Sequence, residues 1–225
     1  MNKFIQLINL EEARIERSGR VILKNIDLSV HDAEIVFIVG DSGSGKSSLL
    51  KSLYGALKIS GKETNVLGFN LEELNVKSIQ QLRKKLGLVF QDFKIFNKLS
   101  VYENLNYFLK AIGFKNEESK HKVINDILAK VDLINYSSKK AFELSGGEKQ
   151  RLSIARALIH KPKLILADEP TGNLNQSLGI EIFKLLRNLA LEQGSSIITA
   201  THDETLASEF SSKFYRCFDQ KLMRV

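Results

Sequence analysis

Hydrophobic residues along the chain occur in two patterns that predict strands. From Lys3 to Val30 they partly alternate with polar residues and are interrupted by Ser18-Gly19, which predicts antiparallel strands. Short continuous apolar runs occur instead at 35–39, 86–90, 164–167 and 197–200. Such runs are typical of parallel strands buried on both faces. We therefore expect an α/β fold with a parallel core sheet, doubly wound, and an antiparallel β part at the N-terminus.

A helical pattern replaces these runs between Gln91 and Ser145. Apolar residues there follow one another at spacings of three and four: Val101, Leu105, Phe108 and Leu109, then Val123, Ile127, Leu128 and Val131. We interpret 92–145 as an inserted helical subdomain. Residues 1–91 and 146–225 would then form the catalytic core of a single domain. The polar stretch from Gly113 to Lys120 is expected to be an exposed connection.

Composition narrows the class of protein only a little. The chain has 225 residues, 43% of them hydrophobic, which suffices for one domain with a substantial core. Its net charge of +7 suits phosphate ligands, nucleic acid or an anionic membrane surface equally well. No signal-peptide pattern and no run of 18 apolar residues is present, so we expect neither export nor a membrane span. The single cysteine, Cys217, cannot form an internal disulfide, which agrees with a reducing cytoplasm.

The stretch from Gly40 to Ser47 is a complete G-x-x-x-x-G-K-[ST] phosphate loop. An apolar strand leads into it and a helical stretch, 47–57, follows it, which is the context that the motif requires. A glycine-rich surface turn would explain the glycines but not the Lys-Ser pair after a buried strand. Lys46 is predicted to reach the outer phosphates and Ser47 to hold Mg2+. The candidate nucleotide-binding residues here are Gly40, Asp41, Ser42, Gly43, Ser44, Gly45, Lys46, Ser47 and Ser48.

Polar side chains also stand where three other strands end. Asp168 and Glu169 follow the run 164–167, where open α/β sheets place their ligands. We expect Asp168 to bind Mg2+ and Glu169 to act as the catalytic base for the attacking water. His202 is a candidate contact of the γ-phosphate, and Gln91 a candidate ligand of Mg2+ or water. Alone, each would more often be a solvated residue at a strand end.

Ser145-Gly146-Gly147-Glu148 has the spacing of a capping box before a helix expected over 149–160. A glycine-rich helix N-terminus is also an anion site, because its N–H groups and the Ser145 hydroxyl are available to a phosphate. Taken alone, the segment favours the plain cap.

Together these motifs resemble the ATP-binding subunit of ATP-binding cassette systems. The phosphate loop matches Walker A, Gln91 the Q-loop, Leu144 to Glu148 (LSGGE) the signature, LILADE Walker B, and His202 the switch histidine, all in the family order. The resemblance implies ATP and Mg2+ as cofactors. It also implies a homodimer that holds each ATP between Walker A of one copy and the signature of the other, which would make Ser145, Gly146, Gly147 and Glu148 nucleotide ligands.

Within the family, DEPTGNL at 168–174 resembles the branch of lipoprotein-releasing, macrolide-export and cell-division ATPases. The stretch VFQDFK at 89–94 is similar to the FtsE-type cell-division ATPases. That resemblance implies a peripheral protein on the cytoplasmic side of the cell membrane, coupled to an FtsX-like integral membrane protein and to control of cell-wall hydrolysis. No nucleic-acid partner is expected. The alternatives are the ATPase of a lipoprotein-releasing or macrolide-export transporter, and an ATP-dependent structural tether at the division site.

Three features stay open at the level of sequence. Asn175 stands where the branch has Asp, which loses a charge in the D-loop, and the aromatic residue expected near position 15 or 16 to stack on adenine is absent. The apolar cluster around Phe93 and Phe96 is either local core or a docking surface. The resemblance favours docking, since family members receive a helix of the membrane partner beside the Q-loop.

Overall fold

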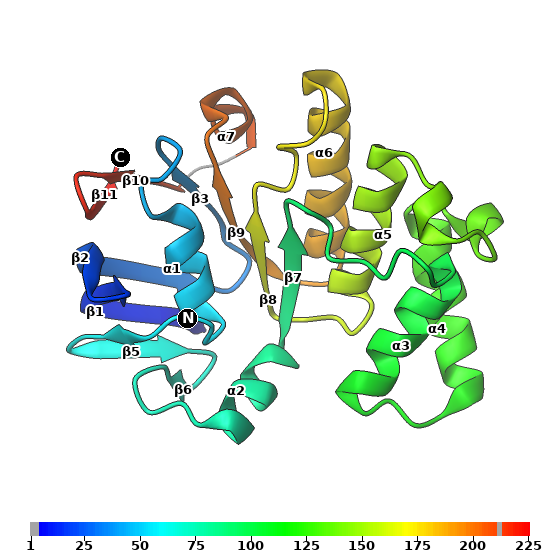
Figure 1. The fold of residues 1–225 in the computed structure, drawn as a ribbon, viewed down its shortest axis with the longest axis horizontal. Helices are drawn as coiled ribbons and strands as arrows, with labels where there is room; N and C mark the ends of the chain where they lie inside the picture. The colour runs from blue at the N-terminus through cyan, green and yellow to red at the C-terminus, as the bar shows by residue number, and fades with distance from the viewer. Residues whose placement is uncertain (1–4, 211–212) are drawn as a thin grey trace.

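The computed structural model describes residues 5–210 and 213–225, and its N-terminal half contains an antiparallel sheet (Figure 1). The strand order is β2-β1-β5-β6, with β4 paired to β1. This arrangement confirms the antiparallel pattern read from the alternating residues. The strands are β1 (Gln6–Arg17), β2 (Arg20–His31), β4 (Ile59–Ser60), β5 (Glu63–Val66) and β6 (Phe69–Asn70).

The second sheet has the order β11-β10-β3-β9-β8-β7 and is parallel except for the β10–β11 hairpin. Four of its strands, β3, β9, β8 and β7, lie next to one another and coincide closely with the continuous apolar runs of the sequence. Burial on both faces explains those runs, because Phe37 and Val39 face one hydrophobic core while Val36 and Ile38 face the other. The strands are β3 (Ile35–Val39), β7 (Leu86–Phe90), β8 (Leu164–Asp168), β9 (Ser196–Thr201), β10 (Lys213–Phe218) and β11 (Lys221–Arg224).

Helices cover both faces of this parallel sheet. One helix, α1 (Lys46–Leu53), packs between the two sheets, and α2 (Val76–Arg83) precedes β7. On the opposite face lie α5 (Gly146–Leu158), α6 (Gln176–Glu192) and α7 (Glu204–Phe210). Beyond α5, at one end of the molecule in Figure 1, stand α3 (Val101–Ile112) and α4 (Glu117–Lys130), with short 3₁₀ turns at Ile134–Tyr136 and Ala141–Glu143.

Two elements differ from the pattern read along the chain. The first helix ends at Leu53 rather than 57, and Gly55 follows in a left-handed conformation with φ 68°. The expected connection from 113 to 120 is shorter, because Asn116 caps α4 by accepting a hydrogen bond from the Ser119 N–H. Lys120 therefore lies in a helix and is buried, with an ion pair to Glu117. No helix in the described residues combines the length and apolarity needed to cross a membrane.

Candidate nucleotide site

The phosphate loop connects β3 to α1 at the carboxyl end of the parallel sheet. Gly40, Gly43 and Gly45 have φ values of 143°, 83° and 109°, a region that residues with a Cβ rarely adopt. A Cβ on Gly40 would lie 2.4 Å from the carbonyl oxygen of Cys217 in the neighbouring strand. Burial raises the pKa of the Cys217 thiol to about 11, so this residue acts as packing beside the loop. Glycine is thus required at position 40 for both conformation and space.

Lys46 occupies the inside of this loop. Its side chain is buried, and its Nζ donates to the carbonyl oxygens of Gly40 (2.7 Å) and Asp41 (3.0 Å). The Ser44 hydroxyl is also buried and has no partner among the described residues. A phosphate in the loop would supply the acceptor that Ser44 lacks and would compete with the two carbonyls for Lys46. The loop therefore has unsatisfied hydrogen-bonding capacity that suits an anion.

Ser47 and Asp168 meet although 121 positions separate them in the sequence. The Ser47 hydroxyl donates to Asp168 Oδ1 at 2.8 Å. Burial raises the pKa of Asp168, and the hydrogen bond from Ser47 offsets part of that rise. A cation beside the carboxylate would stabilise its charged form. The pair is therefore chemically suited to Mg2+, which accepts few protein oxygens together with phosphate and water.

Glu169 directly follows the strand β8 and has a strained backbone, with φ 46°. Its carboxylate is 12% exposed, and His202 Nδ1 lies 3.0 Å from each of its oxygens. Lys46 Nζ lies 3.9 Å from Glu169 Oε1. The structure thus brings three sequence-identified residues together, with His202 against the carboxylate that we regard as the base.

Gln91 has an exposed side chain at the end of β7, and it lies against the segment that follows Glu169. Its Nε2 would be 3.3 Å from a Cβ placed on Gly172, and its carbonyl oxygen accepts from Asn173 Nδ2 at 2.6 Å. The sequence analysis missed Asn173 and Gln150, whose Nε2 donates to the Pro170 carbonyl at 2.5 Å. Gln150 is buried and connects α5 to the segment after the strand-end carboxylates. The sequence could not reveal this role, because the burial of Gln150 depends on the folded chain.

The signature residues form the capping box that their spacing predicts. The Ser145 hydroxyl accepts from the Glu148 N–H at 3.3 Å, while the Ser145 N–H donates to Glu148 Oε2 at 2.7 Å. That second hydrogen bond lowers the pKa of Glu148. Ser145 and Gly146 are exposed, so this helix N-terminus is open to solvent in a single copy.

The sequence departs from the family pattern at Asn175 and near position 15, and these two positions differ in their structural surroundings. Asn175 is the N-cap of α6 and accepts from the Leu178 N–H at 3.0 Å. Asparagine caps a helix as well as aspartate does, so the local shape is kept without the charge. Ile15 is fully buried in the antiparallel sheet and offers no surface to a base.

A strand leading into a phosphate loop and helix, in the same parallel sheet as a strand that ends in two carboxylates, defines a P-loop nucleoside triphosphatase. The family model described as ABC transporter matches residues 23–172, more than half of the chain and all of the motifs except His202. The chain therefore belongs to the ABC transporter family, as an ATP-binding subunit with ATPase activity.

Curated relatives agree with this assignment. The cell division ATP-binding protein FtsE of Streptococcus pneumoniae is 40% identical over 194 residues, covering 85% of this chain and 82% of the relative. The lipoprotein-releasing system ATP-binding protein LolD of Francisella tularensis is 40% identical, with 89% and 87% covered. The ABC transporter ATP-binding protein YtrE of Bacillus subtilis is 42% identical, with 86% and 84% covered.

Solved structures confirm the predicted fold class. The subunit cbiO1 from Clostridium perfringens, part of the ABC transporter complex cbiONQ, has a TM-score of 0.88 and 29% identity, covering 98% of this chain and 88% of that one. The ATP-binding cassette MJ0796, solved as a dimer after hydrolysis with ADP and Pi, has a TM-score of 0.83 and 30% identity, with 96% of each chain covered.

Proposed function

We propose that this ATPase works as a homodimer that couples ATP hydrolysis to an FtsX-like integral membrane protein and thereby acts in cell division. The observation that carries the catalytic part is the meeting of Lys46, Ser47, Asp168, Glu169 and His202 at one edge of the sheet. The partner is inferred from the FtsE relatives and from a groove described below.

In the proposed reaction, Lys46 leaves the carbonyls of Gly40 and Asp41 and binds the outer phosphates of ATP. Glu169 accepts a proton from the attacking water, and His202 holds the carboxylate in position from 3.0 Å away. Ser47 and Asp168 would hold Mg2+, which neutralises phosphate charge during transfer. Gln91 would report the state of this site to the segment that follows it.

The exposed signature helix supports the proposed dimer. In one copy, Ser145 and Gly146 face solvent and make no use of their anion-binding capacity beyond the capping box. A second copy would bring them to the phosphates bound in the first. MJ0796, a bacterial ABC transporter cassette of similar structure, was solved as a dimer.

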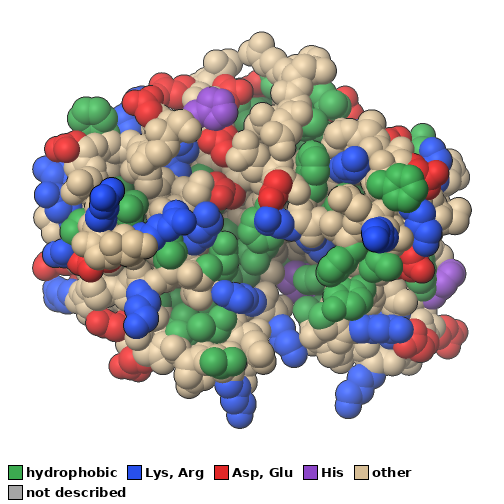
Figure 2. Space-filling model, viewed as in Figure 1, with side chains coloured by type: hydrophobic (Ala, Val, Ile, Leu, Met, Phe, Trp, Pro, Cys, Tyr) green, Lys and Arg blue, Asp and Glu red, His purple; other side chains and the backbone are tan. Residues whose placement is uncertain are grey.

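A groove of about 600 Å³ between the core and the segment 92–145 is the proposed docking site for the partner. Its floor comes from β7, and Phe96 and Tyr107 contribute an edge-to-face pair with centroids 4.9 Å apart. Phe96 is 48% exposed, while its backbone N–H is held by the buried Asn104 at 2.8 Å. The fixed backbone presents the ring outward, which favours docking over local core. Hydrophobic side chains gather in this hollow in Figure 2.

The charges around the groove specify the chemistry of the docking segment. Four cations line it, Arg83, Lys84, Lys94 and Arg156, and among the described residues no carboxylate does; Lys94 is paired outside the lining with Asp92 at 2.6 Å. Burial lowers the pKa of Arg156 to about 10, but this value is still high enough for the guanidinium to be charged at neutral pH. An amphipathic helix with an apolar face and flanking Asp or Glu residues complements such a groove. Rotation of the proposed helical subdomain, 92–145, would then pull on the membrane protein, which would hold this subunit at the cytoplasmic side of the membrane.

Phe96→Asp tests the docking surface. We expect the variant to lose co-purification with an FtsX-like membrane partner, while its melting temperature and ATP binding stay near wild type. Phe218→Asp is the matched control, since Phe218 is 60% exposed on the C-terminal hairpin, away from the groove. Undiminished partner binding by Phe96→Asp would exclude this groove, and a collapsed melting temperature would assign Phe96 to the core.

A transporter role is the second candidate, because LolD is as similar in identity as FtsE. The neighbouring reading frame separates the two. A four-span membrane protein with a large extracytoplasmic loop would support the FtsX-like partner, whereas permease genes with a substrate-binding protein would support transport.

A further inference from the structure

A second basic cavity, of about 730 Å³, lies at the edge of the parallel sheet opposite the nucleotide site. Lys84 and Lys85 immediately precede β7, and Lys161 and Lys163 precede β8, so all four stand at the amino ends of these strands. The phosphate loop and Asp168 stand at the carboxyl ends. These four residues therefore have no part in the nucleotide reaction. We call the cavity that they line the lysine cavity.

The four lysines are exposed, and none forms an ion pair within the described part of the chain. Their backbone is nevertheless firmly held. Ser195 Oγ donates to the Pro162 carbonyl at 2.5 Å, and the Ser196 N–H donates to the Lys163 carbonyl at 2.9 Å. Lys85 Nζ lies 4.8 Å from the centroid of the Phe69 ring. The lysine side chains therefore extend from a backbone that is held in place by hydrogen bonds.

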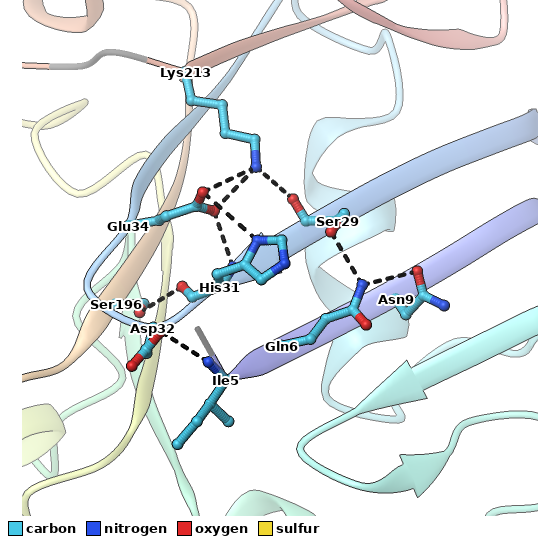
Figure 3. A network of polar contacts seen from close by, with 9 residues as sticks. All are labelled: Ile5, Gln6, Asn9, Ser29, His31, Asp32, Glu34, Ser196 and Lys213. Atoms are coloured by element: carbon cyan, nitrogen blue, oxygen red, sulfur yellow. Dashed lines mark hydrogen bonds and ion pairs between the residues drawn. The ribbon is translucent and has the colours of Figure 1, made fainter. Parts of the chain in front are cut away.

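Nearby carboxylates do not neutralise this cavity. Of the described residues, Asp32 is the one carboxylate that lines it, and its Oδ1 accepts from the Ile5 N–H at 3.0 Å (Figure 3). Glu34 accepts from Lys213 at 3.0 Å and from the His31 N–H at 2.9 Å in the same network. His160 also lines the cavity, but burial lowers its pKa, so it adds no charge at neutral pH. Four positive charges therefore face a single negative one.

We propose that the lysine cavity binds the anionic headgroups of a phospholipid membrane. Lys84 lines both this cavity and the proposed partner groove, so the two features adjoin at this residue. A membrane protein docked in that groove would bring its own bilayer toward the cavity. Several lysines on one face bind anionic lipid surfaces, with a contribution that adds up over the residues.

The location argument rests on the proposed partner groove, but the binding itself is measured without a partner. The isolated full chain is sedimented with vesicles of phosphatidylcholine alone and of phosphatidylcholine with phosphatidylglycerol. We expect binding to the anionic vesicles only. The variant Lys84→Gln, Lys85→Gln, Lys161→Gln, Lys163→Gln should bind them about tenfold more weakly or worse.

A charge-matched control separates the cavity from net charge. Lys24, Lys58, Lys122 and Lys221 are exposed, lie outside the cavity and have no ion pair in the described residues. Changing these four to Gln lowers the net charge equally and should leave vesicle binding near wild type. Equal losses in the two variants would overturn the proposal in favour of general attraction. Wild-type binding by the cavity variant would overturn it directly.

A competition experiment with inorganic phosphate tests whether the cavity binds a free small anion instead of a lipid headgroup, since both present a phosphate group. At constant ionic strength, phosphate should not displace the protein from anionic vesicles if the cavity recognises a membrane surface. Displacement by phosphate, with loss of phosphate binding in the cavity variant, would identify a small-anion site instead and overturn the membrane assignment. Loss of partner co-purification in Phe96→Asp with vesicle binding intact would leave this proposal standing and affect only the groove.

Discussion

Replacing Glu169 by Gln gives the sharpest test of the proposed catalytic site. The amide has the shape of the carboxylate, so it can keep the contact with His202 and the left-handed backbone at this position. It cannot accept a proton from water. A positioned general base contributes about 10²- to 10⁴-fold to rate, so turnover should fall by that amount. Lys46, Ser47 and Asp168 remain in place, and ATP binding should therefore persist.

Without hydrolysis, ATP should hold the variant as a dimer. The assays are ATP turnover, nucleotide affinity and sizing chromatography with saturating ATP and Mg2+, together with the melting temperature. Glu192→Gln is the control, because Glu192 forms an exposed pair with Lys130 at 2.5 Å and exposed pairs contribute about 0 to 1 kcal/mol. If Glu169→Gln keeps more than about a tenth of wild-type turnover, which is less loss than a general base confers, the assignment of the base is wrong. A folded variant that stays monomeric with ATP would refute the dimer.

Two further substitutions separate the two halves of the nucleotide site. Lys46→Ala should lose most ATP affinity, measured by fluorescence titration, because it removes the buried cation inside the phosphate loop; unchanged affinity would contradict its role. Ser145→Arg should abolish ATPase activity and dimerisation while the monomer still binds ATP, because Ser145 is exposed and serves the other copy's nucleotide. Equal loss of ATP binding by the monomer would place Ser145 in its own chain's site.

Local patterns in the sequence were sufficient for much of the fold. The continuous apolar runs predicted four parallel strands, because a strand covered on both faces cannot expose polar side chains on either. The capping box at Ser145 also formed as its spacing indicated, since its hydrogen bonds span only three residues. Family membership followed from the same motifs, whose order along the chain is itself specific.

Contacts between residues far apart in the chain could not be predicted from the sequence and were decided by the tertiary structure. Ser47 meets Asp168, and Gln150 meets the Pro170 carbonyl, only because the sheet and α5 bring distant segments together. Periodicity could not show that Lys120 is buried, because a charged residue in a polar run looks solvated until its neighbours are placed.

The partner groove and the lysine cavity could not be predicted from the sequence either. Lys84 and Lys163 belong to separate segments of ordinary composition, and nothing in either segment indicates a cavity. Parallel strand order places β7 beside β8, so the residues that precede the two strands converge. The sequence by itself determined which residues are charged and where strands begin. The tertiary structure alone decided which charges share a surface, because that depends on strand pairing between segments far apart in the chain.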